Sequence, residues 1–337
     1  MRRTIRRSVL CAGIATAILT PATALLAPAT ATAGAITPAA TSYTLLTQPA
    51  SGHTALYSLI NNATTSIHLT MYELTDTTAE ADLATAQARG VNVEVILDGK
   101  QTSTNASAYS YLTNHRVAVV YSWSKYYYTH EKSMVVDGST AVVMSENWTP
   151  TYYSADRNFD LIENDPADAA AVETVFAADY AKSSVTPSDG DDLVWSPTDA
   201  QSRLLSLING ASTSLSLYAL EMGSTPIVNA LVSAAGRGVT VKVVAQYNSS
   251  YASAYDTLTS AGVSVVTYGT SDALYIHAKA IVADYGTGAA KVFIGSENFS
   301  STSLNSNREL GLIITSAAVI SSVNSTLAAD FANGTPW

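Results

Sequence analysis

Cysteine is almost absent from this chain of 337 residues, which has only Cys11. Basic side chains are also few, with 17 Lys and Arg against 27 Asp and Glu and a net charge of −10. A single thiol excludes both a disulfide framework and a cysteine-rich metal site. The acidic balance argues against a general nucleic-acid binder, which needs a basic surface.

The chain also lacks a long apolar run after its first 35 residues, so the sequence predicts no membrane-spanning helix there. Residues 1–35 instead have the pattern of a secretory signal peptide: four arginines by position 7, an apolar run over 9–26 and a tail of small residues. Pro21 and Pro28 interrupt the run, which argues against a membrane anchor. The arginine pair at 6–7 leaves the Sec and twin-arginine export routes both open. We therefore expect a secreted protein that loses its cysteine and carries, with 13 Lys and Arg against 27 acids, a net charge of −14.

Residues 128–147, YTHEKSMVVDGSTAVVMSEN, have the pattern of two strands joined by an Asp-Gly turn. Side chains two positions apart in a strand share a face, so His130 and Lys132 point the same way. Ser145 and Asn147 share a face of the second strand by the same rule. A histidine, a lysine, a hydroxyl and an amide on one surface would form a site for a phosphate.

The same pattern recurs at residues 275–298, YIHAKAIVADYGTGAAKVFIGSEN, which argues against a chance match. Met144 of the first copy stands where the second copy has Gly295. Each copy has an aspartate, Asp137 or Asp284, at an odd offset from its histidine, and this offset favours a structural contact behind the strand. The second copy supplies the same residue types in the same order: His277, Lys279, Asp284, Ser296 and Asn298.

The repeat extends over most of the chain at an offset of about 148 residues. Segments 59–61 and 207–209, for example, are both Leu-Ile-Asn. Strand patterns alternate with helix patterns in each repeat, which predicts the α/β class, with each repeat a layered mixed β-sheet flanked by helices. We predict four parts along the chain: a signal peptide at 1–35, a first repeat at 36–183, a linker at 184–192 and a second repeat at 193–337.

The doubled HxKx4D motif, each copy followed by Ser-Glu-Asn, resembles the phospholipase D superfamily, and the resemblance covers nearly all of the chain after the predicted signal peptide. It implies two repeats related by a pseudo-two-fold axis that brings His130 and His277 to opposite sides of one phosphate. One neutral imidazole would attack phosphorus, and the other, as imidazolium, would protonate the departing alkoxide. The resemblance favours His130 as the nucleophile and His277 as the acid and base, with the reverse assignment left open.

Other polar residues complete the predicted site. The lysine and asparagine of each motif would hold the non-bridging phosphate oxygens as charge builds on them. Ser145 and Ser296 are candidates either to donate to the phosphate or to support the residues that contact it. An imidazole that must keep its orientation needs a carboxylate on its other nitrogen, for which Asp160 and Glu309 are suitably placed unless they are surface acids at strand ends. The full catalytic set predicted from the sequence is His130, Lys132, Asp137, Asn147, Asp160, His277, Lys279, Asp284, Asn298 and Glu309.

Aromatic side chains gather before the first motif and flank both. They would form a rim against a lipid head group, an acyl chain or a nucleobase, or else a loop of packed tyrosines. The chemistry needs no metal or cofactor, and His53, His68 and His115 do not lie at metal-ligand spacings. The candidate substrate-contacting aromatic residues are Trp123, Tyr126, Tyr128, Trp148 and Tyr275.

The leading hypothesis is a secreted phosphodiesterase of the phospholipase D type, which hydrolyses a phospholipid to phosphatidate and its head alcohol or transfers the phosphatidyl group to another alcohol. It would contact a lipid surface transiently and act as a monomer, since one chain carries both motifs. The alternative is a metal-independent, non-specific nuclease of the same superfamily, which the acidic charge disfavours unless residues such as Lys100 and Lys125 form a local basic strip. A catalytically silent phosphate-binding module is a third hypothesis, and the lack of a membrane anchor disfavours a cardiolipin-synthase-like role.

Overall fold

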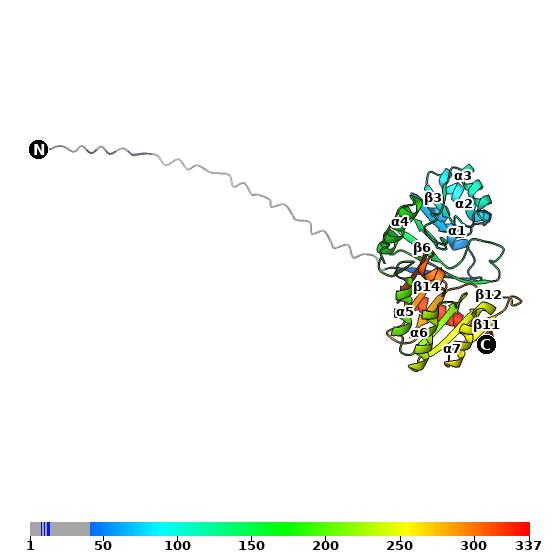
Figure 1. Ribbon diagram of the computed structural model, residues 1–337. Helices are drawn as coiled ribbons and strands as arrows, with labels where there is room; N and C mark the ends of the chain where they lie inside the picture. Colours follow the sequence, from blue (N-terminus) through cyan, green and yellow to red (C-terminus); the bar gives the residue numbers. More distant parts are fainter. Residues whose placement is uncertain (1–7, 9, 11, 14–40) are drawn as a thin grey trace. The chain divides into compact units, whose positions relative to one another are not determined.

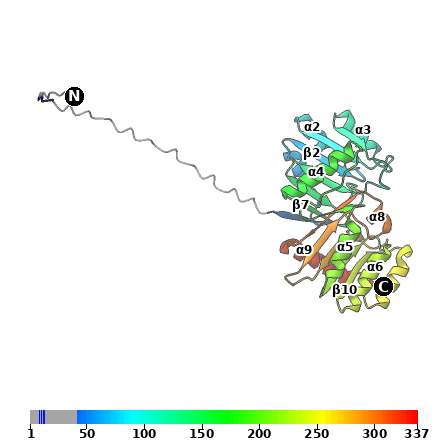
Figure 2. The same ribbon diagram turned by 60° about the vertical axis from the view of Figure 1, so that its left-hand side comes forward.

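The computed structural model describes residues 41–337 and the isolated positions 8, 10, 12 and 13. Apart from those positions, the predicted signal peptide lies outside the described residues. Residues 41–337 form one compact unit, in which two mixed β-sheets are flanked by helices (Figure 1 and Figure 2).

The first sheet mixes parallel and antiparallel neighbours. In order across the sheet its strands are β1 (Tyr43–Gln48), β7 (Asp156–Glu163), β6 (Thr140–Met144), β5 (Lys132–Val136), β2 (Ser66–Met71), β3 (Asn92–Leu97) and β4 (Ala118–Tyr121). Its helices are α1 (Thr54–Asn62), α2 (Thr77–Ala88), α3 (Ala106–Asn114) and α4 (Pro166–Tyr180). β2, β3 and β4 run parallel, whereas β5, β6, β7 and β1 pair antiparallel. The predicted motif hairpin is β5 and β6, which positions the first motif at the centre of the sheet.

The second sheet repeats this strand order. Across the sheet its strands are β16 (Thr335–Pro336), β11 (Ser264–Tyr268), β10 (Thr240–Gln246), β9 (Ser214–Ala219), β13 (Ala280–Ala283), β14 (Lys291–Gly295), β15 (Glu309–Ile314) and β8 (Leu193–Ser196). Its helices are α5 (Ala200–Gly210), α6 (Thr225–Gly236), η1 (Ser249–Tyr251), α7 (Ala252–Ser260), α8 (Ser301–Asn305) and α9 (Ala317–Asn333). The short β12 (Tyr275–Ile276) pairs with β7 of the first repeat. The predicted α/β class and the duplicated layered sheet are confirmed.

The local sequence accounts for several helix ends. Asp76 begins α2, because its side chain accepts hydrogen bonds from the backbone N–H groups of Thr78 and Ala79. α2 and α6 end before Gly90 and Gly238, whose φ angles of 95° and 87° are the left-handed conformation that glycine adopts without strain. Both glycines turn the chain into the next strand, so the same helix-to-strand turn occurs in each repeat.

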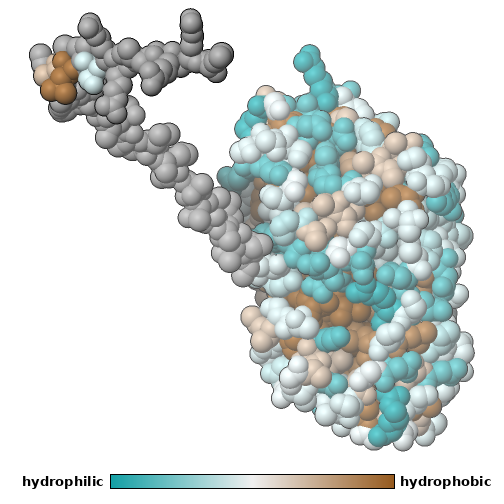
Figure 3. Space-filling view, turned by 90° about the vertical axis from the view of Figure 1, so that its left-hand side faces the viewer, coloured by the Kyte–Doolittle hydropathy of each residue, from teal (hydrophilic) through white to brown (hydrophobic). Residues whose placement is uncertain are grey.

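Apolar packing joins the two repeats. Each sheet has its own cluster of buried side chains under its helices. A third cluster is shared, since Phe159 and Leu161 of β7 belong to it together with Ile294 of β14 and Leu310 of β15, all fully buried. In the described part of the chain no helix is both long and apolar enough to cross a membrane. The face in Figure 3 shows an apolar hollow next to hydrophilic surface.

Two ion pairs, one buried and one partly buried, link the repeats. Arg308, just before β15, donates from Nε and Nη2 to the carboxylate of Asp179 in α4, at 2.7 and 3.2 Å. Arg157 of β7 donates from Nε and Nη2 to Asp330 of α9, at 2.7 and 3.1 Å. Each arginine thus forms a bidentate ion pair with the last helix of the other repeat, α4 or α9. Two parallel hydrogen bonds fix the orientation of the groups as well as their distance.

Replacing Arg308 by Met is expected to lower the free energy of unfolding by about 3–5 kcal/mol, because Asp179 would stay buried without its partner. Urea unfolding followed by circular dichroism measures this loss. The double variant R308M/D179N leaves no charge buried and should be more stable than R308M alone. A double variant that is no more stable than the single one would contradict this account of the junction.

Candidate active site

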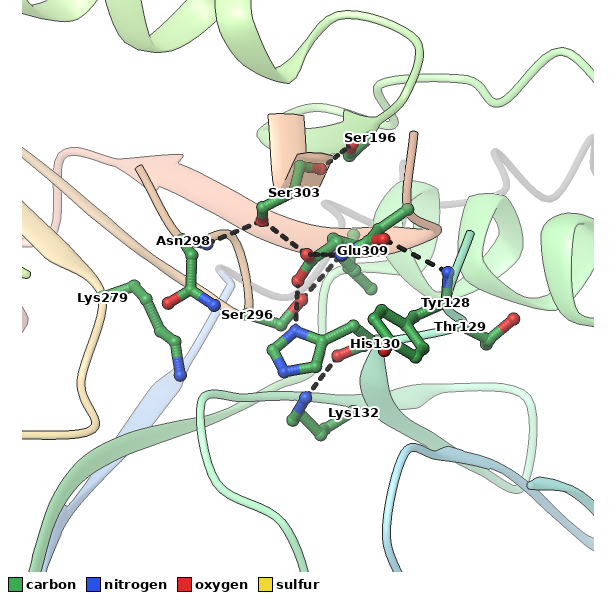
Figure 4. Close-up of polar contacts among 12 residues, drawn as sticks. Tyr128, Thr129, His130, Lys132, Ser196, Lys279, Ser296, Asn298, Ser303 and Glu309 are labelled. Atoms are coloured by element: carbon green, nitrogen blue, oxygen red, sulfur yellow. Dashed lines mark hydrogen bonds and ion pairs between the residues drawn. The ribbon is translucent and has the colours of Figure 1, made fainter. Parts of the chain in front are cut away.

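The histidines of the two motifs lie at the junction of the repeats, each beside residues of the other repeat. His130 lies just before β5, and its backbone N–H donates to the carbonyl of Arg308 in the other repeat at 2.9 Å. His277 lies between β12, which pairs with β7 of the first repeat, and β13. Burial and the nearby charges of Lys279 and Lys132 hold the pKa of His277 well below its usual value. Figure 4 shows that His130, Lys132 and Lys279 converge on one space.

His130 is oriented by a carboxylate from the second repeat. Its Nδ1 lies 2.7 Å from Oε2 of the buried Glu309. Oε1 of Glu309 in turn accepts hydrogen bonds from Ser303 Oγ and from Asn307 Nδ2, the latter at 2.9 Å. Burial lowers the pKa of His130 to about 4 although Glu309 acts to raise it, so the ring is neutral near pH 7. Burial acts to raise the pKa of Glu309, but His130 and Lys132 outweigh it and lower that pKa, which keeps the carboxylate ionised.

His277 is oriented by an amide and not by a carboxylate. Its Nδ1 lies 2.8 Å from Oδ1 of Asn158. Asp160, which the sequence analysis proposed as one of two orienting carboxylates, accepts a hydrogen bond from Gln48 Nε2 at 3.3 Å and interacts with Glu146 instead. The expected role of Asp160 as the second orienting carboxylate is therefore wrong.

A difference in strand register explains the change of partner. Before the first motif, Thr129 bridges to Arg308, which is one residue before Glu309. Before the second motif, Ile276 lies opposite Arg157, which is three residues before Asp160. The second pairing is thus displaced by two residues relative to the first. A shift of two keeps the same face of the strand, so an asparagine occupies the place that the acid would have had.

The lysines of the motifs leave ammonium hydrogens free for an anion. Lys132 Nζ donates to a backbone carbonyl of its own motif, and Lys279 Nζ lies 3.3 and 3.4 Å from the two ring nitrogens of His277. Burial lowers the pKa of both lysines, that of Lys279 to about 8. Among the described residues, the buried Oδ1 atoms of Asn147 and Asn298 have no hydrogen-bond partner. A phosphate would supply the negative charge and the acceptors that the two ammonium groups lack, whereas the two amide oxygens need a hydrogen-bond donor, which a phosphate does not offer.

The motif serines bind protein and do not point their hydrogen-bonding groups at this space. Ser145 Oγ accepts from the backbone N–H of Phe159 at 2.9 Å and donates to Oδ1 of Asn158 at 2.8 Å. Ser296 Oγ accepts from the backbone N–H of Leu310 at 3.2 Å. Each hydroxyl holds the neighbouring strand, which corrects the expectation that the two serines contact substrate.

The motif aspartates lie behind the strands and hold loops. Asp137 accepts hydrogen bonds from the backbone N–H groups of residues 64–66, and Asp284 does the same for residues 212–214. Burial acts to raise the pKa of each carboxyl, but these hydrogen bonds outweigh it and lower the pKa. The odd offset from the histidines indicated this structural contact. Because both carboxylates are held by loops behind the strands, neither aspartate belongs to the catalytic set.

Three of the predicted rim aromatics do not contact the cluster. Trp148 is buried in the core of the first repeat, with 1% of its surface exposed. Tyr126 is also buried, and its hydroxyl accepts a hydrogen bond from Arg308. Trp123 lies instead beside Lys125, whose Nζ is 5.2 Å from the ring. The expectation that Trp148 and Tyr126 contact substrate is corrected, since neither ring is accessible.

The other two predicted aromatics lie near the histidines. Tyr128 packs edge-on against Tyr72, and the Tyr72 ring contacts the His130 ring with 4.6 Å between centroids. Tyr275 is 36% exposed, and its ring centroid is 6.4 Å from that of His277. Aromatic surface thus borders the cluster on both the His130 side and the His277 side.

A cavity of about 460 Å³ opens beside the second motif. Its walls include His277 itself, the rings of Tyr152 and Tyr275, and the carboxyl groups of Asp156 and Asp272. Burial raises the pKa of Asp156 to about 6, so this group is ionised at neutral pH. The cavity combines aromatic faces with negative charge at the edge of a cluster that is itself positive.

The sequence analysis missed Asn158 and Tyr72. A signal for the first was present, because Asn158 and Asn307 each precede one of the two candidate acids by two residues. No pattern indicated Tyr72, which follows β2 and reaches His130 only through the folding of the sheet.

Comparisons with known proteins agree with this architecture. A family model described as a cardiolipin synthase, phospholipase D-like domain matches the chain twice, at residues 56–180 and 204–331. The crystal structure of phosphatidylserine synthase from Haemophilus influenzae Rd KW20 has a TM-score of 0.65 at 13% identity, over 84% of each chain. Polyphosphate kinase from Porphyromonas gingivalis has a TM-score of 0.66 at 14% identity over 86% of this chain, which spans 50% of the kinase chain. These two likenesses are of fold.

A phospholipase D family member from Salmonella typhimurium, Nuc, is also similar. It is 22% identical, with a TM-score of 0.41 over 44% of this chain and 99% of its own. No curated protein matches the chain in sequence.

Proposed function

The chain belongs to the phospholipase D-like family, and from this membership we propose that it is a secreted phosphodiesterase that cleaves the head-group phosphodiester of a phospholipid. The observation that carries the proposal is the cluster at the junction, to which each repeat contributes one histidine and one lysine. His130 and both lysines are buried, and His277 lines a cavity. A single phosphate between the two histidines would contact residues of both repeats.

The proposed reaction has two steps. Nε2 of neutral His130 attacks phosphorus while Glu309 accepts the Nδ1–H of the ring. The bond from phosphorus to the head-group oxygen breaks, and His277 gives that oxygen a proton. Water, deprotonated by His277, then attacks the phosphohistidine and releases phosphatidate and free His130, whereas an alcohol in place of water gives transfer. The lysines and asparagines of the motifs stabilise charge on the non-bridging oxygens in both steps.

The cavity beside His277 supports a phospholipid with a cationic head group. Tyr152 and Tyr275 offer ring faces, and Asp156 and Asp272 offer negative charge, and both features attract an alkylammonium such as choline or ethanolamine. The same carboxylates repel the phosphates of a nucleic acid. A head group in this cavity would leave next to His277, the group that protonates it.

A nuclease is the second candidate, and one observation favours it. Lys100 Nζ lies 3.7 Å from the centre of the Tyr127 ring, and Tyr127 is 52% exposed. Lys100, Tyr127 and Lys125 all border one cavity of about 490 Å³. A basic, aromatic surface of this kind binds single-stranded nucleic acid, although it equally suits anionic lipid.

A substrate panel with a chelator present distinguishes the two candidates. We expect release of choline from phosphatidylcholine micelles in EDTA and no cleavage of plasmid or single-stranded DNA. DNA cleavage without lipid hydrolysis would favour the nuclease. No activity on any diester, together with tight binding of inorganic phosphate, would favour a silent binding module.

Asp272→Asn is expected to raise KM for phosphatidylcholine about 5-fold while changing kcat less than about 2-fold, because one of the charges that attract the head group is lost. KM for phosphatidylglycerol, whose head group is neutral, should stay the same. Asp191→Asn, an exposed position in the linker, is the matched control for loss of one charge. If the two lipids respond equally to Asp272→Asn, the cavity does not hold the head group.

A further inference from the structure

The two histidines of the site differ in the group that accepts their Nδ1–H. His130 meets the carboxylate of Glu309 at 2.7 Å, and His277 meets the amide oxygen of Asn158 at 2.8 Å. The sequence repeat alone would make these two surroundings alike. The two-residue displacement between the strand pairings makes them different, as described above.

The amide oxygen of Asn158 faces both Ser145 and His277. Ser145 Oγ accepts the backbone N–H of Phe159 and donates its own hydrogen to Oδ1 of Asn158. Oδ1 is therefore an acceptor, and the His277 nitrogen that faces it must carry a hydrogen. This assigns the tautomer of neutral His277, with its lone pair on Nε2.

The two backing groups have different chemical consequences. A carboxylate stabilises positive charge on an imidazole, including the charge that the ring gains when Nε2 bonds to phosphorus. An amide holds the ring in place but adds no negative charge. The nearby charges of Lys279 and Lys132 both oppose a second proton on the ring. Its imidazolium therefore gives up a proton readily.

We propose that Asn158 is a positioning residue that orients His277 and keeps it a weak base, so that His277 is the proton donor and carboxylate-backed His130 the nucleophile. The inference rests on the proposed phosphodiesterase function. The negative phosphate of a bound substrate offsets the two lysines and lets His277 hold a proton. That proton passes to the leaving alkoxide, and the water that attacks the phosphohistidine returns one to His277, so each turnover ends with the acid reloaded.

Substrates with different leaving groups test this assignment. A diester of p-nitrophenol needs no acid to expel its leaving group, whereas a diester of an aliphatic alcohol does. Asn158→Ala is expected to lower kcat/KM by about 10²-fold for the aliphatic diester and by less than about 5-fold for the p-nitrophenyl diester. Glu309→Gln gives the nucleophile an amide as well, and it should lower both values by a similar factor of about 10–100. kcat/KM reports the first step alone, so the later hydrolysis does not mask the contrast.

A conservative variant separates orientation from charge. Asn158→Asp keeps the acceptor oxygen and adds the missing charge, so the alkaline limb of the pH profile of kcat/KM should move up by about 1 pH unit or more. NMR of ¹⁵N-labelled histidine in the same variant, without substrate, should show the ring titrating at higher pH. Comparison of melting temperatures identifies any variant that fails to fold.

The outcomes separate two kinds of failure. A wild-type protein that cleaves neither diester refutes the proposed function, whereas the NMR titration still tests the pairing of Asn158 with His277. An active wild type in which Asn158→Ala lowers both diesters equally, or in which Glu309→Gln shows the leaving-group dependence instead, overturns the assignment of roles.

Discussion

His130→Ala is expected to lower kcat/KM for a phosphodiester by about 10⁴-fold, because it removes the atom that bonds to phosphorus. The two lysines and the asparagines would still bind the substrate, so the loss should appear in kcat more than in KM. Initial rates of choline release from phosphatidylcholine micelles, measured in EDTA, give both constants. The activity that remains in His130→Ala would come from direct attack of water on a bound phosphodiester, without a covalent intermediate.

Two companion variants make this result specific. His115→Ala removes an exposed imidazole whose Nδ1 contacts only the carbonyl of Tyr111, and it should leave the rates unchanged. His277→Ala should form the covalent intermediate from a p-nitrophenyl diester but hydrolyse it slowly, since the base for water is missing. Mass spectrometry at neutral pH should then find the phosphoryl group on His130. A His130→Ala protein with more than a tenth of wild-type activity, or an adduct on another residue, would refute this mechanism.

The protein is also expected to lose stability as pH rises from about 6 to 9. Burial raises the pKa of Glu163 to about 9 and that of Glu146 to about 8, far above their values in an unfolded chain. Between those limits the folded state holds protons that the unfolded state has released, so the free energy of unfolding falls as pH rises. Below about pH 6.5, His130 and His277 make the free energy of unfolding rise with pH. Their pKa values are lowered in the folded state, so the unfolded chain binds protons there that the folded protein does not. Above about pH 6.5 the contribution of the histidines is constant, so the fall in stability caused by the two carboxyls should be clearest from there to pH 9.

Glu163→Gln tests the alkaline part of this profile. Within the described residues neither carboxyl oxygen of Glu163 has a hydrogen-bond partner, and Asp168, Asp165 and Asp192 are nearby acids. Glutamine resembles the protonated acid, so the variant should match wild type at pH 5. At pH 9 it should be more stable by on the order of 3 kcal/mol, which corresponds to a melting temperature about 5–10 °C higher. Thermal melts followed by circular dichroism at the two pH values measure the difference.

A half-exposed acid serves as the control for this substitution. Glu94→Gln should change the melting temperature little at either pH, since that side chain is partly exposed to solvent. Equal stability of wild type and Glu163→Gln at pH 9 would mean that Glu163 is not held protonated in the folded protein.

Within one strand or hairpin the sequence was a good guide. The alternation of side chains predicted that His130 and Lys132 share a face, and the odd offset of Asp137 indicated its contact behind the strand. The duplication predicted two similar sheets, and the structure has them. These features depend on neighbours in the chain, whose geometry is fixed by covalent spacing.

Other features depend on contacts between distant segments. Ser145 and Trp148 carry the residue types of a binding site, but the packing of β7 and of the first core takes them away from the substrate. Tyr72 reaches His130 although no motif includes it. Side-chain type gives the chemistry that a residue can do, whereas burial and partners decide whether it is available.

The sequence by itself determined the duplicated fold and the four side chains of the two His-x-Lys pairs. Only the tertiary structure decided which group backs each histidine, because the register between β12 and β7 is set by packing at the junction and not by spacing along either strand. A displacement of two residues there replaces Asp160 by Asn158 beside His277, and so makes a chemically unequal pair out of two nearly identical motifs.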